Sequence, residues 1–207
     1  MKNSSDVEIE VKFFVLSLKE IELKILEMGG TLFQERIFES NLRFDTPDGR
    51  LRNLRHVLRL RKDKDNILTF KGAAEVGKPV SIRQEIEVLV DDFNTTRTLL
   101  EGLGFEVVME YEKYRTTYSL MDTQVVLDEL PYGNFIEIEG QDGKSIQKVA
   151  RNLNLNWKSR VMTSYTYLYE SLKKVRPELE NKYLTFDELK GIKIMPDELG
   201  VSPADLS

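Results

Sequence analysis

The segment VEIEVKF, residues 7–13, alternates apolar and charged side chains without interruption. A β-strand points successive side chains to opposite faces, so Glu8, Glu10 and Lys12 share one face while the other face is wholly apolar. A single edge strand in solvent could show this pattern. The pattern recurs along the chain, however, and that recurrence decides the fold.

Composition limits the chemistry that the chain can perform. Its 207 residues and 41% hydrophobic content suit one domain or a compact two-lobed one. The absence of cysteine excludes disulfides, thiol nucleophiles and thiolate metal sites. His56 is the only histidine, which excludes multi-histidine metal sites and disfavours a histidine-based triad. Any metal must therefore be bound by oxygen, which favours Mg²⁺ or Mn²⁺.

Charge and hydropathy indicate the surroundings of the protein. A net charge of −5 offers no basic field for nucleic acid. No apolar run is long enough to span a membrane, and the N-terminal MKNSSD has no signal-peptide core. We expect a cytoplasmic protein with neither nucleic acid nor membrane as a partner.

Periodicity predicts strands interleaved with helices. Extended segments are predicted at 7–16, 31–44, 57–62, 66–71, 80–90, 105–120, 123–130 and 133–139. Helices are predicted at 17–28, 92–103, 142–154 and 162–175, with Ser17 and Asp91-Asp92 as N-caps and glycines as stops. A charged strand, a helix and an aromatic-rich strand follow Glu8 and again Arg83, which hints at an internal duplication.

The chain is predicted to divide into a main domain, 1–175, and a C-terminal extension, 176–207. The extension carries Pro177, Gly191, Pro196 and Gly200, which are typical of irregular structure. We expect one short helix near 185–190. The apolar residues of the extension predict that it docks on the main domain.

Charged residues lie opposite apolar neighbours on most of the predicted strands. The acidic set is Glu8, Glu10, Glu85, Glu87, Asp128, Glu137 and Glu139, and the basic set is Lys12, Arg59, Arg61, Lys71, Arg83, Lys113 and Arg115. An ordinary antiparallel sheet would expose such ionic faces to solvent. Repeated charge-x-charge spacing, arginine-rich bases and surplus helices favour a closed barrel instead, with apolar faces outside and a hydrated ionic lumen, because dry burial of so many charges is costly. A purely structural salt-bridge lattice stays open as an alternative.

The acids and bases expected to line the barrel lumen predict what the lumen binds. Arginine matches phosphate oxygens bidentately, and about seven bases in one cavity suggest several phosphate groups. Closely spaced glutamates without histidine suit a hard divalent cation. Bases together with a carboxylate-bound metal are typical of phosphoryl transfer.

The same residues resemble the CYTH superfamily, the triphosphate tunnel metalloenzymes, over roughly residues 7–172. Glu8-x-Glu10-x-Lys12 is similar to the family's N-terminal signature. Further matches follow in order: Leu58-Arg59-Leu60-Arg61, Thr69-Phe70-Lys71-Gly72, Arg83-x-Glu85-x-Glu87, Lys113-x-Arg115, Asp128, Glu137-x-Glu139 and Ser164-Tyr165.

The resemblance implies an α+β fold, an eight-stranded antiparallel β-barrel with helices packed outside. It implies metal binding by Glu8, Glu10 and Glu139, with Asp128 and Glu137 nearby, and we add Glu85 and Glu87 as candidates. The bases would bind the phosphates; Arg83 is included, although Glu85 is the better family match on that strand. Lys12 either orients or deprotonates an attacking water or pairs with a glutamate.

Several reactions fit the family. Its members hydrolyse inorganic triphosphate, thiamine triphosphate or nucleoside triphosphates, and some are class IV adenylyl cyclases. We favour a triphosphatase, with cyclase as the alternative, and rank a non-catalytic polyphosphate- or nucleotide-binding module third; an RNA-capping type would need a larger chain and a basic surface. Phe44, Tyr132, Phe135 and Trp157 are candidates for a base-and-sugar pocket, with ordinary packing as their alternative. The interpretation allows a homodimer.

Overall fold

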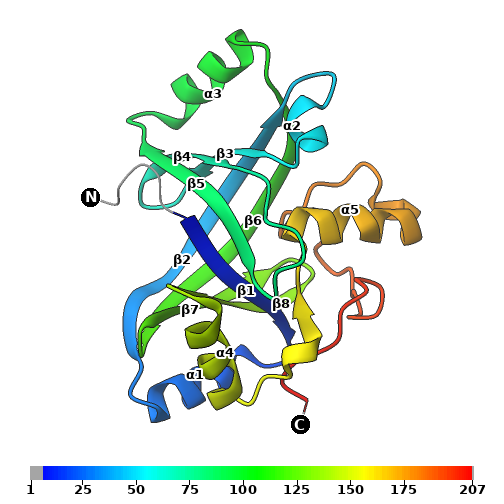
Figure 1. Ribbon diagram of the computed structural model, residues 1–207. Helices are drawn as coiled ribbons and strands as arrows, with labels where there is room; N and C mark the ends of the chain where they lie inside the picture. The colour runs from blue at the N-terminus through cyan, green and yellow to red at the C-terminus, as the bar shows by residue number, and fades with distance from the viewer. Residues whose placement is uncertain (1–6, 207) are drawn as a thin grey trace.

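A computed structural model describes residues 7–206 and confirms every predicted strand and long helix (Figure 1). The MKNSSD segment used to argue against a signal peptide lies outside the described residues. The elements are β1 (Val7–Val15), α1 (Leu18–Glu27), β2 (Thr31–Asp45), α2 (Arg50–Asn53), β3 (Val57–Lys62), β4 (Asn66–Lys71), β5 (Ser81–Leu89), α3 (Phe93–Gly102), β6 (Glu106–Leu120), β7 (Thr123–Leu130), β8 (Gly133–Gly140), α4 (Gly143–Asn152), η1 (Trp157–Ser159), β9 (Arg160–Val161), α5 (Tyr165–Val175) and η2 (Pro177–Leu179).

Eight antiparallel strands form a closed ring. Their order is β5-β4-β3-β2-β6-β7-β8-β1, and β1 pairs with β5 to close it. Strand β1 makes this closure by changing partners along its length. Its first half pairs with β5, with Glu8 opposite Arg83, and its second half pairs with β8, with Lys12 opposite Glu137. The predicted barrel is therefore confirmed, and β1 carries its charged residues across the point of closure.

Two halves of the ring repeat the same succession of elements. Strand β1 has 9 residues, α1 has 10 and β2 has 15, and β5, α3 and β6 have the same three lengths. The corresponding strands also pair with each other, β1 with β5 and β2 with β6. The recurrence expected from the sequence is thus present in the architecture.

Local signals place the helices. Ser17 accepts a hydrogen bond from the Glu20 amide at the start of α1, and Asp92 accepts one from the Thr95 amide at the start of α3. Gly29 and Gly104 follow these two helices with φ values of +80° and +89°, which favour glycine. Helices α1 and α3 therefore occupy equivalent places between their flanking strands.

The apolar faces of the strands are covered from outside the ring. Ile21 and Ile25 of α1 and Ile146 of α4 are fully buried against outward-facing residues such as Phe13 and Ile138. A second cluster joins β8 and α5 through Phe135, Tyr165 and Tyr169. Because helices cover the apolar faces, the opposite, charged faces are turned inward. Tyr132 and Phe135 are buried in the second cluster, Trp157 packs against the first, and Phe44 is buried in a third cluster with Leu60, which agrees with their role in ordinary packing.

The C-terminal segment packs on the barrel, as predicted. Leu184 bridges to Tyr111 of β6, and the Glu112 carboxylate accepts a hydrogen bond from the Phe186 amide at 2.9 Å. Further along, the Asp205 carboxylate accepts hydrogen bonds from the Leu16 and Ser17 amides at 2.8 and 3.0 Å. The segment therefore contacts β6 and the junction between β1 and α1.

One prediction about this segment is wrong: residues 185–190 form consecutive turns and no regular helix. The Leu189 amide donates to the Thr185 carbonyl at 3.2 Å, as in a helical turn. Gly191 then adopts a φ of +77°, which reverses the chain. Because a helix needs several consecutive turns to offset the cost of nucleation, this one does not propagate.

Within residues 7–206, every helix is too short or too polar to cross a membrane.

Candidate functional site

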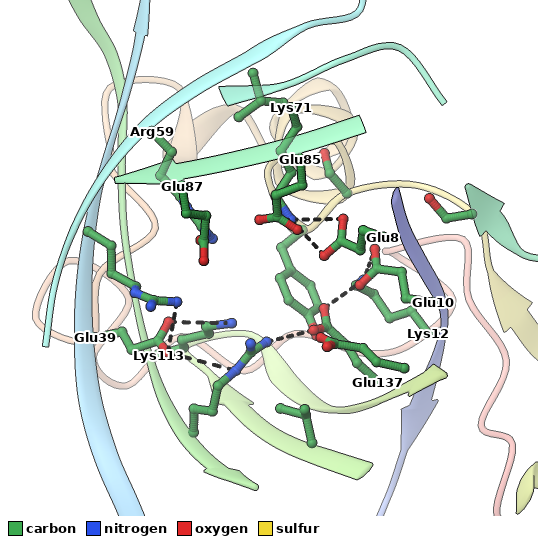
Figure 2. A pocket seen from close by; sticks show the side chains of 18 of the residues that line it. Glu8, Glu10, Lys12, Glu39, Arg59, Lys71, Glu85, Glu87, Lys113 and Glu137 are labelled. Atoms are coloured by element: carbon green, nitrogen blue, oxygen red, sulfur yellow. Dashed lines mark hydrogen bonds and ion pairs between the residues drawn. The ribbon is translucent and has the colours of Figure 1, made fainter. Parts of the chain in front are cut away.

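A cavity of about 340 Å³ runs through the ring and receives side chains from all eight strands and from the start of α5 (Figure 2). All seven predicted bases line it, and so do six of the seven predicted acids. The exception is Asp128, which is fully buried beside the cavity wall. The geometric expectation is therefore confirmed, because the ionised residues of separate segments converge on one shared space.

Asp128 is held by hydrogen bonds from three residues. Its carboxylate accepts hydrogen bonds from Lys113 Nζ at 3.1 Å, from Arg115 Nε at 2.7 Å and from the Tyr165 hydroxyl at 2.8 Å. Arg115 Nη2 adds a further bond to Asp128 at 2.6 Å. With its acceptor positions engaged in this way, Asp128 fixes the directions of Lys113 and Arg115, which line the cavity.

Asp128 belongs to a larger group of matched charges that we call the paired cluster: Lys12, Glu39, Lys113, Arg115, Asp128 and Glu137. Arg115 Nη2 lies 2.6 Å from Glu137 Oε2, and Lys12 Nζ lies 2.7 Å from Glu137 Oε1. Lys113 Nζ and Arg115 Nε lie 3.5 and 3.8 Å from Glu39. Each carboxylate of the cluster thus faces at least two cations.

The matched charges keep the acids of the paired cluster ionised. Burial alone would raise the pKa of the Glu137 carboxyl, but Lys12 and Arg115 outweigh burial and hold that pKa well below its usual value. Burial likewise opposes ionisation of Glu39, and Lys113 and Arg115 nonetheless lower its pKa to about 2. These carboxylates remain ionised at neutral pH because neighbouring lysine and arginine side chains balance their negative charge.

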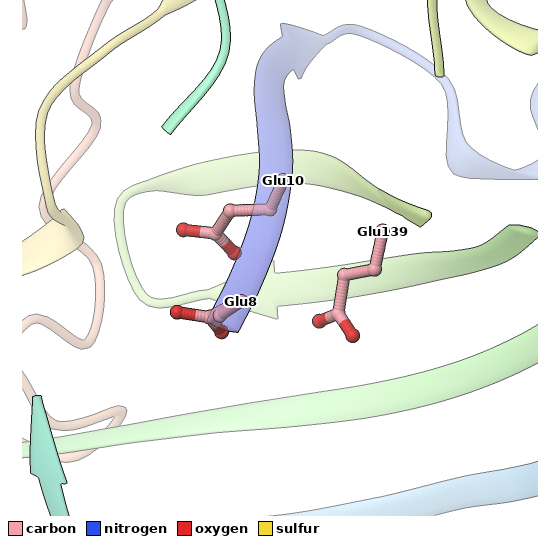
Figure 3. Close-up of side chains that lie close together, drawn as sticks. All are labelled: Glu8, Glu10 and Glu139. Carbon is pink, nitrogen blue, oxygen red and sulfur yellow. The ribbon is translucent and has the colours of Figure 1, made fainter. Parts of the chain in front are cut away.

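A second acidic group lies where β1 meets β8. Glu8, Glu10 and Glu139, called here the carboxylate triad, each offer an oxygen within 4.8 Å of the others (Figure 3). Glu8 also contacts Lys71 at 2.8 Å and Arg83 at 2.9 Å. Although burial opposes it, these two cations lower the pKa of Glu8. Three of the seven predicted metal-binding carboxylates are therefore brought together.

Among the described residues Glu139 makes no ion pair with a base, whereas Glu8 and Glu10 each contact at least one. Burial raises its pKa to about 7, and the negative charge of Glu137 adds to this effect, with smaller contributions from Glu10 and Glu8. A carboxyl group that is hard to ionise next to two other acids needs a further positive charge. Three closely spaced carboxylates, one of which ionises readily only when a positive charge is added beside it, fit a hard divalent cation such as Mg²⁺ or Mn²⁺.

The two remaining predicted ligands, Glu85 and Glu87, lie on β5 beside bases. Glu85 is 3.0 Å from Lys71, and burial together with the nearby charge of Glu8 raises its pKa to about 7. Glu87 is 3.6 Å from Arg59 and accepts a hydrogen bond from the Thr69 hydroxyl at 3.0 Å. A role for these two residues, or for Asp128 and Glu137, in metal binding stays a prediction.

Lys12 lies between the two acidic groups. Its ammonium is 2.7 Å from Glu137 and 3.6 Å from Glu10, and it sits 4.7 Å from the centre of the Tyr165 ring. Burial would lower its pKa, but Glu10 and Glu137 outweigh burial and raise it. A general base would need the opposite shift, so the geometry favours the ion-pair interpretation and a protonated Lys12.

Sequence reasoning missed several cavity residues of β2, β6 and α5: Glu39, Arg43, Tyr111 and Thr166. Glu39 and Arg43 are four residues apart on β2 and share a face with Asn41 between them, so the period-two signal could have found them. Arg43 donates a hydrogen bond to the Thr166 hydroxyl at the start of α5. The aromatic residues of β2, Phe33, Phe38 and Phe44, made its charged face less apparent in the sequence.

Comparison with known proteins adds a family and a fold. The CYTH domain model matches residues 6–165. A protein of Methanocaldococcus jannaschii named "Putative adenylate cyclase" is 25% identical over 188 residues, which cover 90% of this chain and 99% of that protein.

Solved structures share the barrel. A protein of Pyrococcus horikoshii is 27% identical with a TM-score of 0.67, over 77% of this chain and 98% of that one. A "putative adenylate cyclase" of Vibrio parahaemolyticus is 20% identical with a TM-score of 0.69, over 80% and 98%. A Hippeastrum protein, described as a "putative adenylyl cyclase" with a dominant triphosphatase activity, is 19% identical with a TM-score of 0.64, over 79% and 95%.

Proposed function

The chain belongs to the CYTH family, and on that premise we propose that it is a metal-dependent enzyme that binds a triphosphate-containing substrate in the barrel cavity and hydrolyses it. One observation carries the proposal: the carboxylate triad and seven basic side chains face the same enclosed space. A chain of phosphates needs many cations along its length, and a divalent ion needs closely spaced oxygens. Both requirements are met within one cavity.

The bases differ in how fully they are already engaged. Arg115 is bound by Asp128 and Glu137, whereas Arg59 Nε is buried without a hydrogen-bond partner among the described residues. The charged partner of Arg59, Glu87, is 3.6 Å away and partly exposed. A buried guanidinium with unused donors is costly unless a ligand completes its hydrogen bonds. Arg59, together with Arg61, whose Nε is likewise buried without a hydrogen-bond partner among the described residues, is therefore well placed to bind a phosphate.

The carboxylate triad fits the metal that the family uses. A divalent cation bound by Glu8, Glu10 and Glu139 would neutralise negative charge on the phosphate oxygens and make the phosphorus more reactive. Lys71 and Arg83 contact Glu8 and hold it in place beside the other two acids. Lys12 remains protonated between Glu10 and Glu137, from where its ammonium orients the attacking water by hydrogen bonding.

Cyclisation of ATP is the second candidate reaction. It is favoured by the relative from Methanocaldococcus jannaschii, which carries the cyclase name and aligns over 90% of this chain. Hydrolysis and cyclisation need the same set of phosphate-binding groups. They differ in the nucleophile, which is water for hydrolysis and the ribose 3′-hydroxyl for cyclisation.

A product analysis decides between the reactions. The purified full-length protein is incubated with Mg²⁺ or Mn²⁺ and, separately, with inorganic triphosphate, ATP and thiamine triphosphate. We expect orthophosphate to be released. Cyclic AMP with pyrophosphate would establish the cyclase instead, and binding without any product would leave the non-catalytic module. Parallel incubation of Glu10→Gln guards against a contaminating phosphatase, since the activity must fall in that variant.

A further inference from the structure

One part of the cavity wall carries no ionisable side chain. We call it the neutral wall: Phe33 and Gln34 of β2, Thr117 of β6, and Gln124 and Val126 of β7. The rest of the cavity is lined mainly by acids and bases, apart from a second uncharged stretch at Val161, Met162, Thr163 and Ser164 before α5. A phosphate group would meet no cation on the neutral wall, so this part of the cavity suits an uncharged group.

Strand register fixes where the neutral wall lies. Directly opposed residues on neighbouring strands form a continuous row across the ring, in the order Gln34, Thr117, Val126, Glu137 and Lys12. Opposed residues lie about 5 Å apart at their Cβ atoms. The neutral wall therefore joins the paired cluster at the step from Val126 to Glu137.

A second row links the neutral wall to the carboxylate triad. Gln124 of β7 lies opposite Glu139 of β8, and Glu139 lies opposite Glu10 of β1. The neutral wall is thus next to the proposed metal site and on the other side of it from Arg83, which pairs with Glu8 on the far part of β1. A substrate bound to the triad and the bases would have its uncharged part within reach of this wall.

A β-bulge brings two consecutive residues of β2 to the cavity. In a regular strand Phe33 and Gln34 would face opposite sides, but the pairing of β2 with β6 shifts register between Leu32 and Gln34, and both residues line the cavity. Bulges commonly redirect side chains near functional sites. Phe33 remains 65% exposed, so its ring offers an open face at the edge of the cavity.

The chemistry of the wall suits a flat heterocycle. A phenylalanine face stacks on aromatic rings, and a carboxamide both donates and accepts hydrogen bonds, as the edge of a heterocycle does. Gln34 and Gln124 provide two such carboxamides on either side of Thr117 and Val126, which are 6% and 2% exposed. An aromatic face with two neutral polar groups has no use in binding inorganic triphosphate alone.

We propose that the neutral wall is the subsite for the organic group of the substrate, which is a triphosphate ester carrying a flat heterocycle. The inference rests on the proposed function and narrows it from triphosphates in general to organic triphosphates. Nucleoside triphosphates and thiamine triphosphate share this chemistry. In each, the heterocycle would stack on Phe33 and bond to Gln34 and Gln124, while the bases bind the phosphates.

The test compares substrates with and without the organic group. KM is measured for ATP, thiamine triphosphate and inorganic triphosphate with the wild-type chain, Phe33→Ala, Gln34→Ala and Leu32→Ala, after circular dichroism and thermal unfolding have confirmed that each variant is folded. Leu32→Ala is the matched control, because Leu32 precedes Phe33 on β2, is 49% exposed and does not line the cavity. The preferred organic substrate identifies which heterocycle the wall accepts.

We expect Phe33→Ala to raise the KM of the preferred organic triphosphate about tenfold relative to the KM of inorganic triphosphate, since one stacked base contributes about 1–3 kcal/mol. Gln34→Ala should shift the ratio in the same direction, and Leu32→Ala should leave it unchanged. An unchanged ratio in Phe33→Ala and Gln34→Ala, or a wild-type chain that prefers inorganic triphosphate to both esters, would overturn the inference.

Failure of the proposed function gives a different result. If the wild-type chain turns over none of the three compounds, the same comparison is made by calorimetric titration in Mg²⁺, with dissociation constants in place of KM. A preference for the organic triphosphates that Phe33→Ala removes would then support the subsite in a protein that binds without hydrolysing. Equal binding of all three compounds would overturn it.

Discussion

Glu137 and Glu139 are two residues apart on β8 and face the same cavity, Glu137 buried and Glu139 partly buried, yet the protein shifts their pKa values in opposite directions. Lys12 and Arg115 hold the pKa of Glu137 well below its usual value despite its burial. Burial, assisted by the charge of Glu137, raises the pKa of Glu139 to about 7. The same residue type on the same strand face is neutralised internally at one position and left in need of a cation at the other.

This difference separates two tasks within one barrel. Acids of the paired cluster hold the bases of the wall in fixed directions and contribute to stability. In the carboxylate triad Glu8 and Glu10 contact bases, whereas Glu139 makes no ion pair among the described residues, and we propose that a divalent metal supplies the missing positive charge. Residue type therefore does not decide the role of a carboxylate here; its cross-strand neighbours do.

The largest expected effect follows removal of a charge from the paired cluster. Asp128→Asn leaves Lys113 and Arg115 buried with a weaker partner, and breaking a buried pair in this way costs about 3–5 kcal/mol. We expect a loss of that size in the free energy of unfolding, measured by urea denaturation.

Glu129→Gln is the matched control, because Glu129 is the next residue of β7 and pairs with Arg36 on the surface. Its change should stay below about 1 kcal/mol. Equal effects in the two variants would remove the distinction between the paired cluster and an ordinary surface pair.

Lowering the pH is expected to reduce the free energy of unfolding by a smaller amount. Glu39 has a pKa lowered to about 2, so its contribution to stability is fully present above its ordinary pKa of 4.5 and is lost as the pH falls through 2. The shift corresponds to about 3 kcal/mol at most. We expect the wild-type chain to lose more stability between pH 5 and pH 2 than Glu39→Gln does. Chemical denaturation at several pH values measures this, and parallel curves for the two proteins would show that Glu39 is not stabilised by its ion pairs.

Much of the fold could be predicted because its signals are local. Alternation predicted all eight strands, Ser17 and the Asp91-Asp92 pair predicted two helix starts, and opposite charged and apolar faces predicted the charged interior. The turn segment at 185–190 could not be predicted, because its six residues, four of them polar, fit a short helix as well as a series of turns.

The site was less predictable, because cross-strand register depends on how the ring closes. Period two shows that Glu137 and Glu139 share a face, but it does not show that Lys12 lies opposite Glu137 while Gln124 and Glu10 flank Glu139. Asp128 is similar: the sequence places it among the acids, and only the packing of α5 brings the Tyr165 hydroxyl to it. Side-chain direction was thus readable from the sequence, whereas partners were not.

A titration with Mn²⁺ tests most directly whether the carboxylate triad binds a divalent cation. Binding is measured calorimetrically with the full-length wild-type chain, Glu139→Gln and the surface control Glu129→Gln, without any phosphate compound. We predict that the wild-type chain and Glu129→Gln bind Mn²⁺ with equal affinity, that Glu139→Gln binds at least about tenfold more weakly, and that all three remain folded. Undiminished Mn²⁺ binding by Glu139→Gln, or no binding by the wild-type chain, would contradict the account.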